Sequence, residues 1–109
     1  MFHMLSCFDL VCGVSINEFE DSNSAFVKHM RDLELVQSTG PIGRRNRHPV
    51  MDTDEKHDQE YFYIMSFVDE NQCELAVNYI QSHAEPGNSV HVSLSSKIEN
   101  QVFICWEDI

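Results

Sequence analysis

Hydrophobic residues recur along this chain with two periods, one typical of strands and one typical of helices. Residues 2–10 form a short run of aromatic and aliphatic side chains, which predicts a buried strand. Alternation divides its side chains between two faces, one with His3, Leu5 and Cys7 and the other with Met4, Ser6 and Phe8. Residues 61–68 are aromatic or β-branched and apolar on both faces, so we expect the central strand there. Residues 101–107 predict a further strand of the same kind.

Two stretches carry apolar residues at three- and four-residue spacings, which predicts two amphipathic helices. Ser15-Ile16-Asn17-Glu18 has the pattern of a capping box, so the first helix should begin there and run to about residue 33. Its apolar stripe comprises Ile16, Phe19, Phe26, Met30 and Leu33. Asp69 and Gln72 repeat the capping pattern and predict a second helix over roughly residues 70–84.

The remaining segments are less regular. Residues 35–44 look extended but are interrupted by Gly40-Pro41, which predicts an irregular or edge strand. Residues 47–59 are polar and charged and predict a loop. Between residues 89 and 98 the pattern fits either a strand or a helix, and we favour a short helix. The main order of elements is therefore βαββαβ.

This order predicts an α+β fold. Two βαβ units with right-handed crossovers give a ferredoxin-like sandwich, in which a four-stranded antiparallel sheet carries both helices on one face. The 109 residues suit one domain over residues 1–109. Because strands at 61–68 and 101–107 are apolar on both faces, the second face needs a cover that this chain has no spare element to supply. We therefore expect a homodimer.

Charge and composition limit the kinds of molecule that this protein is expected to bind. The chain has 18 acidic and 7 basic residues and a formal net charge of −11, which argues against nucleic acid binding. No apolar run approaches the roughly 20 residues of a membrane-spanning helix. The four cysteines form no Cys-x-x-Cys pair, and the first residues do not resemble a signal peptide. We therefore expect a reduced, cytoplasmic, acidic protein that does not enter a membrane.

Several short stretches carry a resemblance to a known superfamily. They are Phe-His-Met-Leu-Ser-Cys-Phe at the start, Tyr-Ile-Gln-Ser-His at the end of the second helix, and Val-Phe-Ile-Cys-Trp-Glu-Asp near the end. Together with the order of elements, they resemble the dimeric α/β-barrel superfamily of ferredoxin-like proteins. The stretches Gly-Pro-Ile-Gly-Arg-Arg and Met-Asp-Thr-Asp are similar to those of a group of small bacterial proteins of unknown function. The resemblance implies a dimer and, as in many members, an apolar ligand cavity between sheet and helices.

Two histidines are candidates for catalysis. In cyclase-like members of the superfamily, a histidine early in strand one works with another near the end of helix two, and His3 and His83 occupy similar places. The resemblance implies that this pair could transfer protons. The structural alternative is a strand-end His3 and a His83 favoured by the helix dipole. Haem-degrading members use an Asn, a Trp and a helix-two His, of which only His83 could match here.

Other side chains are candidates for ligand contact. Arg44 and Arg45 follow Gly43 at a strand end, and one of them could hold a ligand carboxylate, although ion pairs with the acidic residues 52–60 are the favoured alternative. The remaining ligand-contact candidates are His29, Tyr63, Tyr79 and Trp106. No His-x-His or His-x₃-His spacing occurs at the histidines considered, so we expect no metal site and no cofactor.

These residues favour a homodimer that binds a hydrophobic small molecule, acyl-like or polyketide-like and with or without a carboxylate, between sheet and helices. Proton transfer by His3 and His83 would make it an enzyme. The alternative is a non-catalytic dimeric scaffold or sensor, and a haem-binding monooxygenase is the third and least favoured function. The fold analogy carries no reaction by itself.

Overall fold

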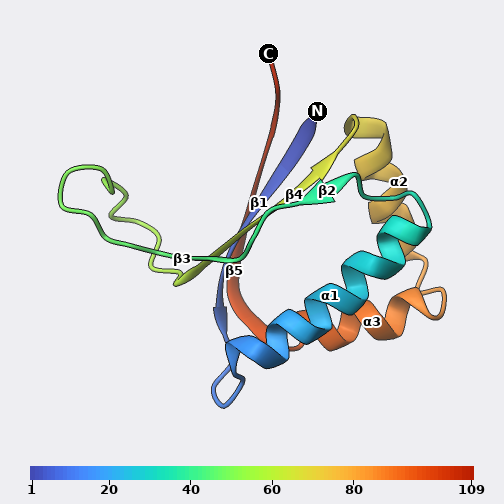
Figure 1. Ribbon diagram of the computed structural model, residues 1–109, viewed down its shortest axis with the longest axis horizontal. Helices are drawn as coiled ribbons and strands as arrows, with labels where there is room; N and C mark the ends of the chain where they lie inside the picture. The colour runs from blue at the N-terminus through green and yellow to red at the C-terminus, as the bar shows by residue number, and fades with distance from the viewer.

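A computed structural model describes residues 1–109 and shows a sheet covered by helices on one side (Figure 1). The three helices all lie on the same side of the strands, as the sequence predicts. In chain order the elements are β1 Phe2–Leu10, α1 Ile16–Asp32, β2 Ser38–Thr39, β3 Gly43–Arg44, β4 Tyr61–Phe67, α2 Glu70–Gln81, α3 Gly87–Ser95 and β5 Ile98–Glu107. None of the helices is both long and apolar enough to span a membrane.

The sheet is antiparallel throughout and has the order β2-β4-β1-β5, with β3 pairing the other end of β4. The α+β ferredoxin-like fold with helices on one face is confirmed. The predicted strand at 35–44 is instead two strands of two residues each, which makes five strands rather than four. Pro41 has no N–H to donate, so continuous pairing with β4 is interrupted between them.

Local capping explains where the helices begin. The Ser15 hydroxyl accepts from the N–H of Glu18 at 3.2 Å, and the Asp69 carboxylate accepts from the N–H of Gln72 at 2.8 Å. The amide oxygen of Gln72 accepts from the N–H of Val68 at 2.7 Å, one residue before the expected partner. Both predicted helix starts are confirmed, because one unpaired N–H of each first turn has found an acceptor.

The second half of the chain departs from the expected bounds at two places. Helix α2 ends at Gln81, three residues earlier than predicted, and His83 has a positive φ of 57°. The expected short helix after it exists as α3, and it begins at Gly87. Strand β5 starts at Ile98 rather than at residue 101, because residues 98–99 still pair with the end of β1 beyond an irregularity in the register.

The core fills the space between the helices and one face of the sheet. Two of its side chains, Phe8 and Met30, are 1% exposed. The ring of Phe8 lies 4.8 Å from that of Phe19 and 5.8 Å from that of Tyr61, so β1, α1 and β4 meet at one aromatic contact. The core cluster comprises Phe8, Phe19, Phe26, Met30, Val36, Tyr61, Tyr63, Met65, Phe67 and Ala76.

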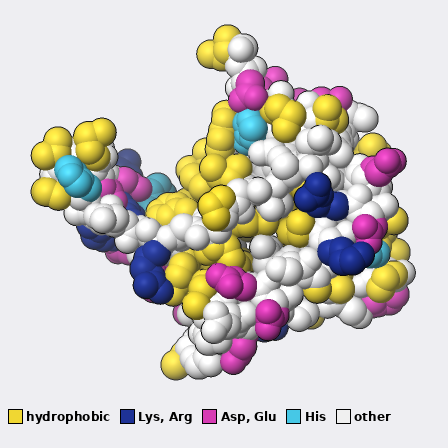
Figure 2. Space-filling view, in the orientation of Figure 1, with side chains coloured by type: hydrophobic (Ala, Val, Ile, Leu, Met, Phe, Trp, Pro, Cys, Tyr) yellow, Lys and Arg dark blue, Asp and Glu magenta, His cyan; other side chains and the backbone are white.

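The opposite face of the sheet has no helix over it. We call it the open face, and it is made of facing side chains from three strands: His3, Ser66 and Trp106, then Leu5, Ile64 and Ile104, then Cys7, Phe62 and Val102. Ile64, Ile104 and Trp106 are 38%, 48% and 40% exposed. Hydrophobic side chains gather along the side of the sheet that faces away from the helices (Figure 2). An uncovered apolar surface of this kind is typical of an interface.

Candidate functional site

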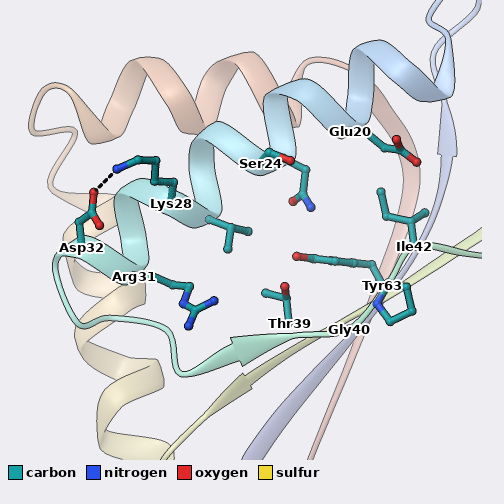
Figure 3. Close-up of a pocket in the computed structure, with 12 residues that line it drawn as sticks. Glu20, Ser24, Lys28, Arg31, Asp32, Thr39, Gly40, Ile42 and Tyr63 are labelled. Atoms are coloured by element: carbon teal, nitrogen blue, oxygen red, sulfur yellow. Dashed lines mark hydrogen bonds and ion pairs between the residues drawn. The ribbon is translucent and has the colours of Figure 1, made fainter.

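A groove of about 900 Å³ lies between α1 and the edge of the sheet that β2 and β3 form (Figure 3). It exists because the two short strands and the turn at Gly40-Pro41 do not fill the space below α1. The groove is lined by Glu20, Asn23, Ser24, Val27, Lys28, Arg31, Asp32, Thr39, Gly40, Pro41, Ile42 and Tyr63. The resemblance implies an apolar cavity between sheet and helices, whereas the groove found there is lined mostly by polar residues.

Asn23 holds a position in α1 that the helical pattern reserves for an apolar residue. It follows Phe19 by four residues and precedes Phe26 by three, so it falls on the buried stripe of the helix. Its side chain is 7% exposed and lines the groove. No hydrogen bond joins the amide to another group of the protein, and its polar atoms are not sealed from the groove. This amide is available to a ligand.

Two hydroxyl groups face the same space from the sheet. Tyr63 extends from β4 with its hydroxyl directed across the groove toward α1, and Thr39 stands beside it on β2 (Figure 3). The Tyr63 side chain belongs to the core and the residue is 6% exposed, yet its hydroxyl forms no hydrogen bond with the protein and is open to the groove. A tyrosine whose ring is buried and whose hydroxyl reaches a cavity is suited to orient a bound molecule.

The charges of the groove are arranged at its ends. Lys28 and Asp32 pair with each other at 2.8 Å, whereas the guanidinium of Arg31 forms no ion pair. Arg31 leaves α1 toward the sheet near Thr39, and Glu20 lies at the other end (Figure 3). A free guanidinium next to unpaired hydroxyl and amide groups is an arrangement that binds a carboxylate or another oxyanion.

The predicted histidine pair is not brought together. His3 lies on the open face, where its ring stacks on Trp106 with centroids 5.1 Å apart, Nδ1 contacts the Ser66 hydroxyl at 2.7 Å and Nε2 contacts an Asp108 oxygen at 2.8 Å. His83 is exposed just beyond α2, on the helix side of the sheet. The expectation that both look into the space between sheet and helices is therefore wrong for His3, because the helices cover the face of β1 that carries Phe8.

The groups around His3 have the composition of a hydrolytic triad but not its surroundings. Ser66 lies within a strand that is hydrogen-bonded on both sides, so no free backbone N–H beside it could stabilise an oxyanion. The hydrogen bond from His3, with its charge and that of the amino terminus, lowers the pKa of Asp108. These contacts tie the end of the chain after β5 to β1.

The two predicted arginines are engaged elsewhere. Arg45 forms an ion pair with Asp52 at 2.7 Å, and its side chain is 7% exposed. Arg44 lies over the ring of Tyr61 at 5.6 Å and 3.4 Å from a Glu60 oxygen. Neither arginine lines the groove. Both form ion pairs with acidic residues of the segment 52–60, which is the alternative favoured from the sequence.

His29 and Tyr79 contact each other rather than the groove. The ring of His29 on α1 and the hydroxyl of Tyr79 on α2 are 2.7 Å apart, which links the two helices. Burial, followed by the charge of His83, lowers the pKa of His91 nearby on α3. Of the candidate site residues predicted from the sequence, only Tyr63 lines the groove.

The sequence interpretation missed Arg31, Thr39 and Asn23. Thr39 and Arg31 carry no distinguishing signal, because one is in an irregular extended segment and the other is one of several charges on a helix. Asn23 does carry one. It is a polar residue at the centre of an apolar stripe, and such a residue either pairs inside the core or faces a ligand.

Comparison with known proteins identifies the fold. No protein-family model matches the chain, and no curated protein matches it. Among solved structures, the Arabidopsis thaliana protein At3g17210 superposes with a TM-score of 0.75 at 7% identity, covering 100% of this chain and 96% of that one. A dimeric ferredoxin-like protein of unknown function from Jannaschia sp. gives 0.63 at 11% identity, covering 98% of both chains. The fold is ferredoxin-like.

A third structure with this ferredoxin-like fold is described as an antibiotic biosynthesis monooxygenase. It superposes with a TM-score of 0.61 at 9% identity and covers 100% of this chain and 99% of that one. At such identities the likeness shows the fold alone. The sequence-based resemblance to dimeric ferredoxin-like bacterial proteins of unknown function is confirmed at that level.

Proposed function

We propose that this protein is a homodimer that binds an amphiphilic small molecule with a carboxylate in the groove under α1. The observation that carries the proposal is Asn23, a 7% exposed amide with no protein partner in the middle of a buried stripe. The fold gains little from an unpaired amide at a position on its buried stripe, since a leucine would pack better against the neighbouring apolar side chains. A ligand that accepts or donates a hydrogen bond at this point explains its presence.

The lining indicates which chemistry the ligand has. Arg31 would hold the carboxylate in a two-point contact, and Thr39 and Tyr63 would donate to its remaining lone pairs. Val27 and Ile42 offer an apolar wall for the rest of the molecule. Only 3 of the 12 lining residues are hydrophobic, so a short acyl-like or polyketide-like compound fits better than a long alkyl chain.

Dimerisation through the open face is the second part of the proposal. It is supported by the exposed Ile64, Ile104 and Trp106 on that face, and by structural neighbours described as dimeric. Pairing two copies face to face would bury these side chains. Proton transfer by His3 and His83 is not part of it, because the sheet lies between them.

Ligand binding is tested with octanoate as the probe, followed by chemical-shift changes in the NMR spectrum of the labelled protein. The expected result is saturable shifts at Tyr63 and Thr39. Arg31→Gln should raise the dissociation constant by roughly fivefold or more, the loss expected for a charge-assisted hydrogen bond. Arg47→Gln is the matched control, because Arg47 pairs with Asp58 outside the groove.

Equal affinity in both variants would show that octanoate binds elsewhere. No saturable shift with octanoate, and no excess mass released by denaturation from the protein purified from cells, would favour the non-catalytic scaffold or sensor. Light scattering at low micromolar concentration tests the dimer separately, and a mass of one chain would reject that part alone.

A further inference from the structure

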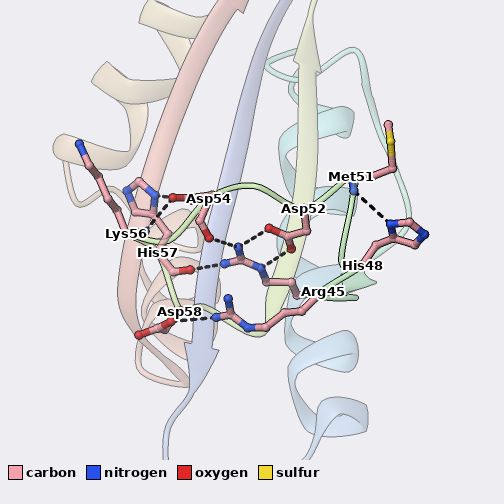
Figure 4. Close-up of polar contacts among 9 residues, drawn as sticks. Arg45, His48, Met51, Asp52, Asp54, Lys56, His57 and Asp58 are labelled. Carbon is pink, nitrogen blue, oxygen red and sulfur yellow. Dashed lines mark hydrogen bonds and ion pairs between the residues drawn. The ribbon is translucent and has the colours of Figure 1, made fainter.

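The loop between β3 and β4 leaves the body of the protein on the side away from the helices (Figure 1). We call residues 45–60 the arm. Its interior is organised by Arg45, whose guanidinium donates to both carboxylate oxygens of Asp52 at 2.8 and 2.7 Å and to the carbonyl oxygens of Asp54 and His57 (Figure 4). The side chains of Arg45 and Asp52 are 7% and 17% exposed. The arm is therefore a folded loop with its own polar core.

The outermost part of the arm is apolar. Val50 and Met51 are 71% and 79% exposed, the highest values among the large hydrophobic residues before the chain end. Nδ1 of His48 accepts from the N–H of both residues, at 3.2 and 3.0 Å, which fixes this turn (Figure 4). Hydrophobic side chains are visible at the end of the arm in Figure 2. A methionine held at an exposed turn suits a contact with another surface.

The arm is attached at one end of the open face. The N–H of Glu60 donates to the Asp9 carboxylate at 2.9 Å, and the Gln59 amide donates to the Asn100 carbonyl at 2.6 Å, so the arm is tied to the ends of β1 and β5. Cys7 belongs to the open face yet is only 6% exposed, and its burial raises the pKa of the thiol. The arm thus covers the end of the face and rises beyond it.

We propose that the arm is a clasp, whose Val50–Met51 tip packs against a second copy of this chain. This inference rests on the proposed homodimer. In a two-fold pairing of open faces, an arm that stands on the face side of one copy meets the other copy, and symmetry supplies two such contacts. The arm and the open face lie on the same side of the molecule, which makes a second copy the occupant that continues the same interface.

Because Arg45 already orders the arm in the single chain, little conformational entropy is lost when it binds. The Val50 and Met51 side chains also contribute little to the packing of the single chain, since most of their surface is exposed to solvent. A change at the tip should therefore alter association without altering the stability of the chain. That separation makes the clasp testable.

The experiment compares two double variants by sedimentation equilibrium. Val50→Asp with Met51→Asp places two charges at the tip, and Leu75→Asp with Val92→Asp places the same charges on helix residues that are both 51% exposed. The dissociation constant of the dimer should rise by roughly tenfold or more in the tip variant and stay near that of the parent in the helix variant. Circular dichroism checks that both variants are folded.

A dimer of unchanged affinity in the tip variant would overturn the clasp and leave the homodimer standing. A parent that is monomeric would overturn both. A photo-crosslinking amino acid at position 51, in a mixture of heavy and light isotope-labelled chains, gives a second measurement. Mixed-label crosslinks are expected, and crosslinks confined to one chain in a dimeric sample would contradict the clasp.

Discussion

Asn23→Leu should raise the free energy of unfolding and weaken ligand binding in the groove. The position is helical, and leucine exceeds asparagine in helix propensity by about 0.4 kcal/mol. Residue 23 is 7% exposed, so roughly half or more of the leucine would be newly buried apolar surface, worth about 1 kcal/mol. Removing the amide adds little, because its polar atoms are open to the groove. The net gain in the free energy of unfolding is about 1 kcal/mol after side-chain ordering.

The gain is measured by urea unfolding at one fixed protein concentration, because association would shift the midpoint. Asn17→Leu is the control, since Asn17 is exposed on the same helix and its substitution should change stability by less than about 0.5 kcal/mol. Octanoate titration of Asn23→Leu should show weaker binding than the parent. If Asn23→Leu lowered the free energy of unfolding, the amide would be serving the fold, and the reasoning for a ligand at this point would fail.

Three further outcomes are expected. Gly87→Ala should cost about 1–3 kcal/mol in thermal unfolding, because a Cβ there overlaps the ring of Tyr79, whereas a Cβ at Gly43 would make only an ordinary contact with the Phe62 carbonyl oxygen at 3.8 Å and should cost little; equal losses would contradict this. The hydrogen bond from Arg45 lowers the pKa of Asp52, so the arm should stay ordered through the pH range where an ordinary aspartate protonates and lose its order only on further acidification, as the Arg45 Nε–H signal in NMR would report. Loss of that signal already at or above the ordinary aspartate range would not fit an arm held by that ion pair. Since each chain carries a net charge of −11, added salt should tighten the dimer in sedimentation, and dissociation by salt would point to ion pairs instead.

Local periodicity was sufficient to place most of the elements. The alternating core side chains of β4 and the stripe from Phe19 to Met30 are each set by one segment's own contacts with the core, so their pattern is visible without the rest of the chain. The caps at Ser15 and Asp69 are local in the same sense. A weaker pattern over residues 89–98 predicts a short helix, and α3 is present there.

The face of β1 that the helices cover could not be predicted in this way. Its two faces are almost equally apolar, one with Leu5 and Cys7 and the other with Met4 and Phe8. Which face receives the helices depends on the handedness of crossovers and on the size of side chains from other segments. The histidine pair failed for this reason, because an alternation pattern places His3 on a face but does not say what lies over that face.

The groove has the same kind of origin. It is formed by what is missing at the sheet edge, since strands of two residues on either side of Gly40-Pro41 leave space beneath α1. Unfilled space produces no periodic pattern in the sequence. The irregular segment 35–44 therefore predicts an edge strand but not the groove beside it. The exception is Asn23, where the helix opposite that space departs from its own apolar stripe. A polar residue in an otherwise apolar stripe indicates that packing alone does not determine the residue at that position. Such positions are expected at binding sites, where local folding preferences are overridden by function.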